Sequence, residues 1–233
     1  MRVLVTRPDV SARKTAAKLA ALGHEPLLLP LMKAAHDTDA SGRALSESRG
    51  AIAVTSAEAL RTLPPESLAA ALHRPIFCVG PATAKAAEAL GFRDVRCGQG
   101  TGLDLADLVI AAGKGADPLT YFAGSPRSPD FERRLTQAGI SFHTVDVYRM
   151  VPIEHDPMAV TMHLREKRPD VILLYSREIA RRFFELVEPA ALRAIGNVRF
   201  LCMSAHVADA VPAHSGDIVI AAEPSEKALL SLL

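Results

Sequence analysis

Short apolar runs rich in β-branched residues alternate along this chain with segments whose apolar residues recur every three or four positions. The short runs predict β-strands, and the longer periodic segments predict helices. Strands that alternate with helices in this way are typical of parallel sheets covered by helices on both faces. The predicted strands are residues 2–6, 25–30, 51–55, 75–79, 94–97, 118–123, 141–147, 170–175, 198–203 and 217–221.

The same arrangement occurs twice. Residues 3–30 and 119–147 each predict a strand, a helix that ends at a glycine (Gly23, Gly139) and a second strand. Two similar halves predict two similar lobes, with a cleft between them. The later segments correspond in the same order, 51–63 with 171–186, 76–91 with 199–216, and 94–109 with 217–233.

The number of strands and two irregular segments predict how the lobes are divided. Ten strands are near the upper limit for one open twisted sheet, so we expect two sheets of five. Segment 34–49 is polar and rich in Ser, Asp and Ala, and segment 149–158 has two prolines and no periodicity. Both follow the second strand of their repeat, which suggests that the chain crosses between lobes at both. The predicted lobes are residues 1–33 plus 152–233, and residues 34–151. A single division at residue 116 is the alternative.

Composition and charge exclude several classes of protein. With 233 residues and 49% hydrophobic content, the chain is long enough for two domains. A net charge of +1 argues against a nucleic-acid partner, which would need a basic face. No apolar run is long enough to span a membrane, and the strand pattern begins at residue 2, so we expect no leader and a cytoplasmic location. Three scattered cysteines predict neither a disulfide nor a metal site.

Small polar and basic residues follow the predicted strands. Ligands of open α/β sheets bind beyond the carboxyl ends of the strands, where helix N-termini attract carboxylates and phosphates. Serine and threonine also cap helices there, and for a single residue capping is the more common role. The candidates of this kind are Arg7, Ser56, Thr83, Ser125, Ser176 and Ser204.

Other motifs of known chemistry are incomplete. Residues 98–102 read Gly-Gln-Gly-Thr-Gly, which lacks the spacing and position of a dinucleotide-binding fingerprint, so we expect a flexible loop. Residues 123–127 do not form a nucleophile elbow, and no histidine or cysteine spacing predicts a metal site. Among the eight histidines, only His206 follows a predicted strand end.

Tyr148 ends a predicted strand where the chain is expected to cross between lobes. Its phenol can donate a hydrogen bond and act as a weak acid. For a single tyrosine, however, packing over the connection between the lobes is the simpler interpretation. Arg149 follows it, and Arg7, Arg127 and Arg177 lie near other strand ends. Their guanidinium groups can bind carboxylates in bidentate geometry, although solvated surface arginines remain the alternative for each.

Taken together, several blocks of the chain resemble uroporphyrinogen-III synthases over nearly its whole length. The blocks are VLVTRP (3–8), AVTSAEA (53–59), CVGPATAKAAEALG (78–91), YFAGS (121–125), VYR (147–149) and AAEPSEKALLSLL (221–233). The resemblance implies two flavodoxin-like α/β lobes with parallel sheets, joined by two extended connecting segments. It also implies cofactor-free and metal-free cyclisation of hydroxymethylbilane, a linear tetrapyrrole, to uroporphyrinogen III, with loss of water and inversion of ring D.

The resemblance also assigns roles to residues. Tyr148 would assist departure of the hydroxide, and Ser56, Thr83 and Ser176 would bind substrate, mainly its carboxylates. Arginines and serines at other strand ends complete the predicted substrate site, namely Arg7, Ser125, Arg149 and Ser204. A transient hand-over of substrate from the preceding pathway enzyme is a further expectation.

One block departs from the family pattern. The second copy of the GPAT block reads Met203-Ser204-Ala205-His206-Val207, so the expected threonine is replaced by Val207, and Ser204 or His206 could compensate. This loss of a hydroxyl favours the alternative function, a non-catalytic two-lobed binding or regulatory protein for an anionic small molecule. A nucleotide-dependent enzyme is a weaker alternative, because no phosphate-binding motif is complete.

Overall fold

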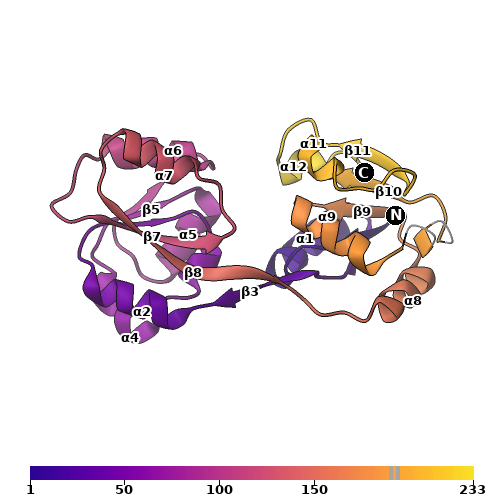
Figure 1. Cartoon of the computed structure of the whole chain (residues 1–233), viewed down its shortest axis with the longest axis horizontal. Coiled ribbons are helices and arrows are strands. Elements are labelled where there is room, and N and C mark those ends of the chain that lie inside the picture. The colour runs from indigo at the N-terminus through magenta and orange to yellow at the C-terminus, as the bar shows by residue number, and fades with distance from the viewer. Residues whose placement is uncertain (189–190, 193–194) are drawn as a thin grey trace. The chain divides into compact units, whose positions relative to one another are not determined.

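The computed structural model describes residues 1–188, 191–192 and 195–233. They form two compact units, which are Met1–Lys33 with Val151–Leu233 (unit 1) and Ala34–Met150 (unit 2). Each unit is built around its own sheet of mainly parallel strands, with helices on the faces (Figure 1). The α/β fold class predicted from the sequence is confirmed.

Unit 1 contains a parallel sheet in the order β11-β10-β9-β1-β2. Leu19 of α1 and Leu229 of α12 pack on one face. On the other face, Phe183 of α9 packs edge-on against Phe200 of β10, with 6.2 Å between ring centroids. The elements are β1 (Arg2–Val5), α1 (Asp9–Ala21), β2 (Glu25–Leu28), α8 (Pro157–Lys167), β9 (Val171–Leu174), α9 (Arg177–Leu186), β10 (Arg199–Cys202), α11 (Ala205–Ala208), β11 (Asp217–Ile220) and α12 (Glu226–Leu230).

Unit 2 contains a sheet in the order β3-β8-β7-β4-β5-β6. Leu105 of α6 and Phe131 of α7 pack on one face, whereas helices α2 to α5 cover the other. The elements are β3 (Met32–His36), α2 (Thr38–Glu47), β4 (Ile52–Val54), α3 (Ala57–Leu60), α4 (Pro65–Leu68) with a 3₁₀ turn (Ala69–Ala71), β5 (Ile76–Cys78), α5 (Pro81–Ala89), β6 (Val95–Cys97), α6 (Gly102–Ala111), β7 (Leu119–Ser125), α7 (Asp130–Gln137) and β8 (Phe142–Pro152).

The sixth strand of unit 2 corrects the expectation of two five-stranded sheets. β3 is mostly exposed, so no apolar run marks it in the sequence. It is defined by backbone hydrogen bonds with β8: the Asp37 N–H donates to the Val147 carbonyl at 2.8 Å, and the Ile153 N–H donates to the Leu31 carbonyl at 2.9 Å. The chain passes between the units along β3 and β8 (Figure 1).

The two segments proposed as passages between lobes consist largely of regular secondary structure. Segment 34–49 includes the end of β3 and the helix α2, which begins after Asp37, whose carboxylate accepts a hydrogen bond from the Ala40 N–H at 2.8 Å. Segment 149–158 includes the last residues of β8 and the start of α8, where Asp156 accepts from the Met158 N–H at 3.0 Å. Side-chain caps, not apolar periodicity, define where these helices begin.

The glycines that end the duplicated helices have the conformation expected of them. Gly23 follows α1 with φ of 79°, and Gly139 follows α7 with φ of 66°. A positive φ is costly for residues with a Cβ atom, so glycine is favoured at both positions. The prediction that both helices end at glycine is confirmed.

Candidate active site

In each unit the strand order reverses direction at one point, and open α/β sheets bind ligands beyond the carboxyl ends of the strands there. In unit 1 this point lies between β1 and β9, which are followed closely by Arg7 and Ser176. In unit 2 it lies between β4, which leads to Ser56, and β7, which ends at Ser125. Four predicted site residues therefore lie beyond the carboxyl ends of the strands where ligands of this fold class bind.

A bulge in β8 determines which way Tyr148 points. The register between β7 and β8 shifts at Gly124, which pairs with Tyr148, so Val147 is an extra residue in β8. Val147 and Tyr148 are adjacent in the chain, yet both pack against the same hydrophobic cluster. In a regular strand they would face opposite sides of the sheet. The bulge therefore brings the phenol to the face covered by α3.

The Tyr148 ring lies across the backbone of Gly124. A Cβ atom at Gly124 would overlap the ring and the hydroxyl of Tyr148, so glycine alone leaves room for it. The pKa of the Tyr148 phenol is raised by burial, while the nearby Ser56 hydroxyl opposes the rise and the charge of Glu58 adds to it. The phenol therefore keeps its proton at neutral pH and can donate it in a hydrogen bond.

Ser56 and Ser176 cap the helices that follow them. The Ser56 hydroxyl oxygen accepts from the Glu58 N–H at 3.1 Å, and the Ser176 oxygen accepts from the Ile179 N–H at 3.2 Å. The capping role considered from the sequence is thus confirmed for both. A cap uses the oxygen as an acceptor, so each hydroxyl hydrogen is still available to a ligand.

Replacing Ser56 or Ser176 by alanine is expected to lower the free energy of unfolding by about 1 kcal/mol each, because a helix loses its cap. Ser204 is a matched control, since it occupies the same position before α11 but makes no capping bond. Urea denaturation of the three variants tests this. A Ser204→Ala variant as destabilised as the other two would contradict the assignment.

Thr83 and Val207 occupy equivalent positions in the two units. Each is the third residue of its helix, α5 or α11, and each is buried, with 5% and 4% of its surface exposed. Threonine and valine have similar volumes and both are β-branched, so the replacement preserves packing at this position and removes a hydroxyl. The half-buried Ser204 remains beside it at the end of β10, whereas His206 is exposed.

The predicted arginines differ in what they already bind. Arg7 pairs with Glu226 at 2.8 Å, and its guanidinium lies 4.1 Å from the centre of the Tyr175 ring. Arg127 is held by Glu132 and Asp146. Within the described part of the chain, Arg149 is exposed and forms no ion pair, and the buried Nε of Arg177 has no hydrogen-bond partner. Of the four predicted arginines, Arg149 and Arg177 are the two without an ion pair among the described residues.

Glu226 connects Arg7 to several donors in unit 1. Its carboxylate accepts hydrogen bonds from Thr15 at 2.6 Å, from Tyr175 at 3.2 Å and from Lys18. Burial alone would raise the pKa of Glu226, but hydrogen bonds from Lys18 and Thr15, with the nearby charges of Arg7 and Lys18, hold that pKa below its ordinary value. The carboxylate thereby fixes Arg7 beside the carboxyl end of β1.

The lowered pKa of Glu226 predicts a pH-dependent contribution to stability. A carboxylate with a depressed folded-state pKa stabilises the fold above its ordinary pKa of 4.5 and loses this contribution as the pH falls through the folded value. Glu226→Gln should therefore be about 1–2 kcal/mol less stable than wild type at pH 7. The difference should shrink as the pH falls below 4.5. Denaturation curves at pH 7 and pH 3.5 test this, and a constant difference would contradict it.

A cavity of about 210 Å³ lies at the carboxyl ends of the strands in unit 2. Thr55, Val79, Tyr121 and Arg127 contribute to its wall, together with the loop at residues 98–102. The Gly98 N–H donates to a carbonyl of β5 at 2.8 Å, so this loop is attached to the sheet edge. The loop expected from sequence thus forms part of the cavity near the strand ends.

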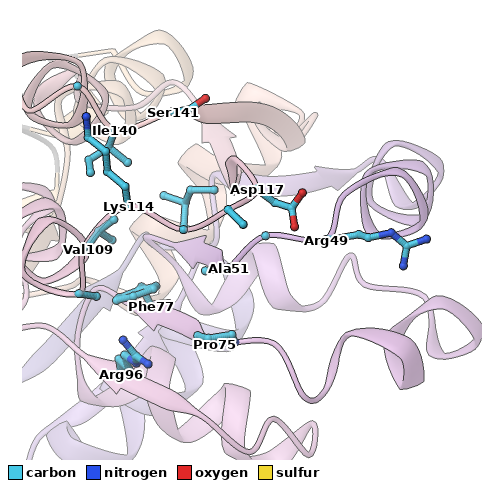
Figure 2. A pocket seen from close by; sticks show the side chains of 17 residues that line it. Arg49, Ala51, Pro75, Phe77, Arg96, Val109, Lys114, Asp117, Ile140 and Ser141 are labelled. Atoms are coloured by element: carbon cyan, nitrogen blue, oxygen red, sulfur yellow. The ribbon is translucent and has the colours of Figure 1, made fainter.

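A second cavity of unit 2, of about 410 Å³, lies at the opposite edge of the sheet, where β4, β5 and β7 begin (Figure 2). Figure 2 shows the side chains of Arg49, Arg96 and Lys114 pointing in separate directions. Arg96 is also paired with Asp94 through two hydrogen bonds. Because its charged groups do not converge and it lies away from the carboxyl ends, we do not assign the active site to this cavity.

The cysteines and acidic side chains offer little metal-binding chemistry. Cys78 and Cys202 are buried in β5 and β10, and burial raises the pKa of their thiols to about 12 and about 11. Among the described residues, no group of three or more His, Cys, Asp or Glu side chains could hold a metal ion. No helix in the described part of the chain is long and apolar enough to cross a membrane.

Three residues near these side chains were not predicted from the sequence. Glu58 and Glu226 were not predicted because neither follows a strand directly, although both lie in blocks that carry the family resemblance. His36 ends β3, so the expectation that His206 alone follows a strand end is wrong. The error has the same cause as the missing strand, since β3 has no apolar pattern.

Comparisons with known proteins agree on one family. The sequence model of the family described as uroporphyrinogen-III synthase HemD matches residues 13–231. No curated protein matches the chain. A solved uroporphyrinogen-III synthetase from Helicobacter pylori 26695 is 16% identical, with a TM-score of 0.64 over 99% of this chain and 96% of that chain. A mutant uroporphyrinogen III synthase from the extremely thermophilic bacterium Thermus thermophilus is 19% identical, with a TM-score of 0.54 over 100% and 96%.

At these identities the structures demonstrate a shared fold, and the family model supplies the relationship in sequence. The match includes Ser56, Thr83, Tyr148 and Ser176, and 219 of the 233 residues (13 to 231 inclusive) lie within it. The chain belongs to the uroporphyrinogen-III synthase family.

Proposed function

We propose that the chain cyclises hydroxymethylbilane to uroporphyrinogen III, with loss of water and inversion of ring D. Family membership supports the reaction. The structural observation that carries the assignment of the catalytic group is the β8 bulge, which turns the protonated phenol of Tyr148 towards Ser56 at a ligand-binding edge of the sheet. The non-catalytic alternative rests on Val207 alone, and the buried position of that residue gives it no further support.

The main task of such an enzyme is to control the conformation of its substrate. Hydroxymethylbilane loses its hydroxyl readily, and closure without an enzyme gives the symmetrical type I ring. Formation of the type III ring requires attack by the substituted carbon of ring D, through a spiro intermediate. Holding a flexible chain in one reactive geometry can lower a barrier by about 7–11 kcal/mol in favourable intramolecular cases.

Tyr148 is the proposed acid. Its phenol donates a hydrogen bond to the substrate hydroxyl and transfers its proton as the carbon–oxygen bond breaks, so that water departs. The positive charge left on the pyrrole system is offset by oriented dipoles and by the carboxylates of the substrate. Substrate and product differ by one water, so the reaction is formally that of a lyase and consumes no co-substrate.

The remaining predicted residues are proposed as contacts for the eight substrate carboxylates. Hydroxyl groups donate single hydrogen bonds, and an unpaired guanidinium can donate two in parallel. Arg149 is suited to this role because it is exposed and has no ion-pair partner among the described residues, whereas Arg7 would have to share its charge with Glu226. The proposed contacts are Arg7, Ser56, Thr83, Ser125, Arg149, Ser176 and Ser204.

Arg149→Gln is expected to raise KM for hydroxymethylbilane about tenfold while kcat changes less than twofold, because a contact made equally before and during the reaction is lost. Steady-state kinetics with freshly prepared substrate tests the contact, and separation of the product isomers tests the function. If the wild-type protein gave only type I product, the proposed function would be contradicted. An unchanged KM for Arg149→Gln would contradict the contact alone.

We also propose a cytoplasmic location and a transient hand-over of substrate from the enzyme that makes it. The support for the hand-over is chemical, since free hydroxymethylbilane closes spontaneously to the wrong isomer. The hand-over can be tested by coupled assays that contain both enzymes and increasing concentrations of a trap for free hydroxymethylbilane. Loss of type III product in proportion to the trap would contradict it.

A further inference from the structure

His36 and Tyr148 face each other on neighbouring strands of unit 2. Two backbone hydrogen bonds between β3 and β8 join Asp37 to Val147 and Ile153 to Leu31, which fixes an antiparallel register. In this register each step forward along β3 is a step backward along β8, so His36 lies directly opposite Tyr148. In a regular non-hydrogen-bonded pair the Cβ atoms are about 4.5–5.5 Å apart. Here the proximity of both side chains to Glu58 places them on the face covered by α3.

Glu58 connects His36 to the surroundings of Tyr148. The His36 Nε2 lies 2.7 Å from a carboxylate oxygen of Glu58, and Arg61 binds the second oxygen of the same carboxylate. Glu58 is the second residue of α3, and its N–H donates to the Ser56 hydroxyl oxygen. The charge of Glu58 acts on the Tyr148 phenol, raises its pKa and so resists release of the proton.

The charges around the phenol therefore affect how easily Tyr148 can release its proton in the proposed step. When Tyr148 transfers its proton to the departing hydroxide, negative charge develops on the phenol oxygen, and a single carboxylate nearby would oppose it. When His36 carries its second proton, it compensates that carboxylate together with Arg61. The other acidic groups on these strands are occupied, since Asp37 caps α2 and Asp146 binds Arg127.

We infer that His36 is a positioning residue for the cyclisation, and that its imidazolium, held by Glu58, favours proton transfer from Tyr148. The inference rests on the proposed function of Tyr148. The phenol proton leaves in the water molecule, and the phenolate regains a proton from the pyrrole carbon that loses one as the ring closes. His36 keeps its own proton throughout, and protons balance over one turnover.

Two substitutions separate the charge of His36 from its packing. His36→Gln removes the cation and is expected to lower kcat for type III product about tenfold, with KM within twofold of wild type. His36→Arg retains a cation beside Glu58 and should recover most of kcat. Thermal unfolding of both variants shows whether the fold is retained. His36→Asn supplies a second neutral replacement if His36→Gln is unstable, since it should lower kcat to a similar extent.

Parallel assays of wild type and Tyr148→Phe distinguish failure of this inference from failure of the function. The inference is overturned if wild type makes type III product but His36→Gln retains full kcat, or if His36→Arg is as slow as His36→Gln. If wild type itself gives only type I product, the proposed function fails instead. A fall in kcat for His36→Gln that His36→Arg reverses supports the inference.

Discussion

Tyr148→Phe is expected to lower kcat for formation of uroporphyrinogen III about 100-fold, while the free energy of unfolding changes by less than about 1 kcal/mol. The substitution removes only the hydroxyl, and the ring retains its place over Gly124. General acid assistance is lost, whereas the packing of the half-buried ring is not. Product-isomer analysis gives the rate, and urea denaturation gives the stability.

Tyr121→Phe is the matched control for this change. Tyr121 lies in β7 of the same unit, is 1% exposed and forms a hydrogen bond of 2.9 Å with the Thr55 hydroxyl, but it packs on the opposite face of the sheet. Its loss should cost about 1 kcal/mol of stability with less than a threefold effect on kcat. If both variants lost activity and stability in equal measure, Tyr148 would have only a packing role.

Gly124→Ala is expected to lower kcat about as much as Tyr148→Phe and to destabilise the fold by about 1–3 kcal/mol. The added methyl group overlaps the Tyr148 ring and hydroxyl, so the phenol must leave its position beside Ser56. Gly115→Ala is the control, because its Cβ would meet only the Asp117 carbonyl oxygen at 3.4 Å. The kinetic and unfolding measurements are the same as for Tyr148→Phe.

The double variant Gly124→Ala/Tyr148→Phe provides a sharper test of this coupling. If Gly124 matters for catalysis only because it accommodates the phenol, the double variant should be no slower than Tyr148→Phe alone. Two independent reductions in kcat that multiply in the double variant would show that Gly124 has a separate role.

The strands that are buried on both faces could be predicted from the sequence. Val171–Leu174 and Ile52–Val54 are fully buried, and continuous apolar runs mark both. Met32–His36 could not be predicted, since its backbone pairs with β8 while most of its side chains face solvent. Solvent-exposed strands are defined by partners far away in the chain, and no local pattern of residues records those partners.

The candidate site was predictable to the extent that its residues follow strands or match the family's blocks. Ser56, Ser176 and Tyr148 were found in this way. The bulge that orients Tyr148 was not, because an extra residue in a strand is visible only against its neighbour. The pairing of Arg7 with Glu226, which are 219 positions apart, likewise depends on the folded arrangement of unit 1.

Closure of hydroxymethylbilane to the type III ring with the help of the Tyr148 phenol is tested most directly by a single-turnover reaction. The protein is in excess over substrate, so that spontaneous closure does not compete. We expect type III product almost exclusively from wild type, and a much slower reaction with a growing share of type I product from Tyr148→Phe. Type I product at the spontaneous rate from wild type, or an unchanged rate and isomer ratio for Tyr148→Phe, would contradict this mechanism.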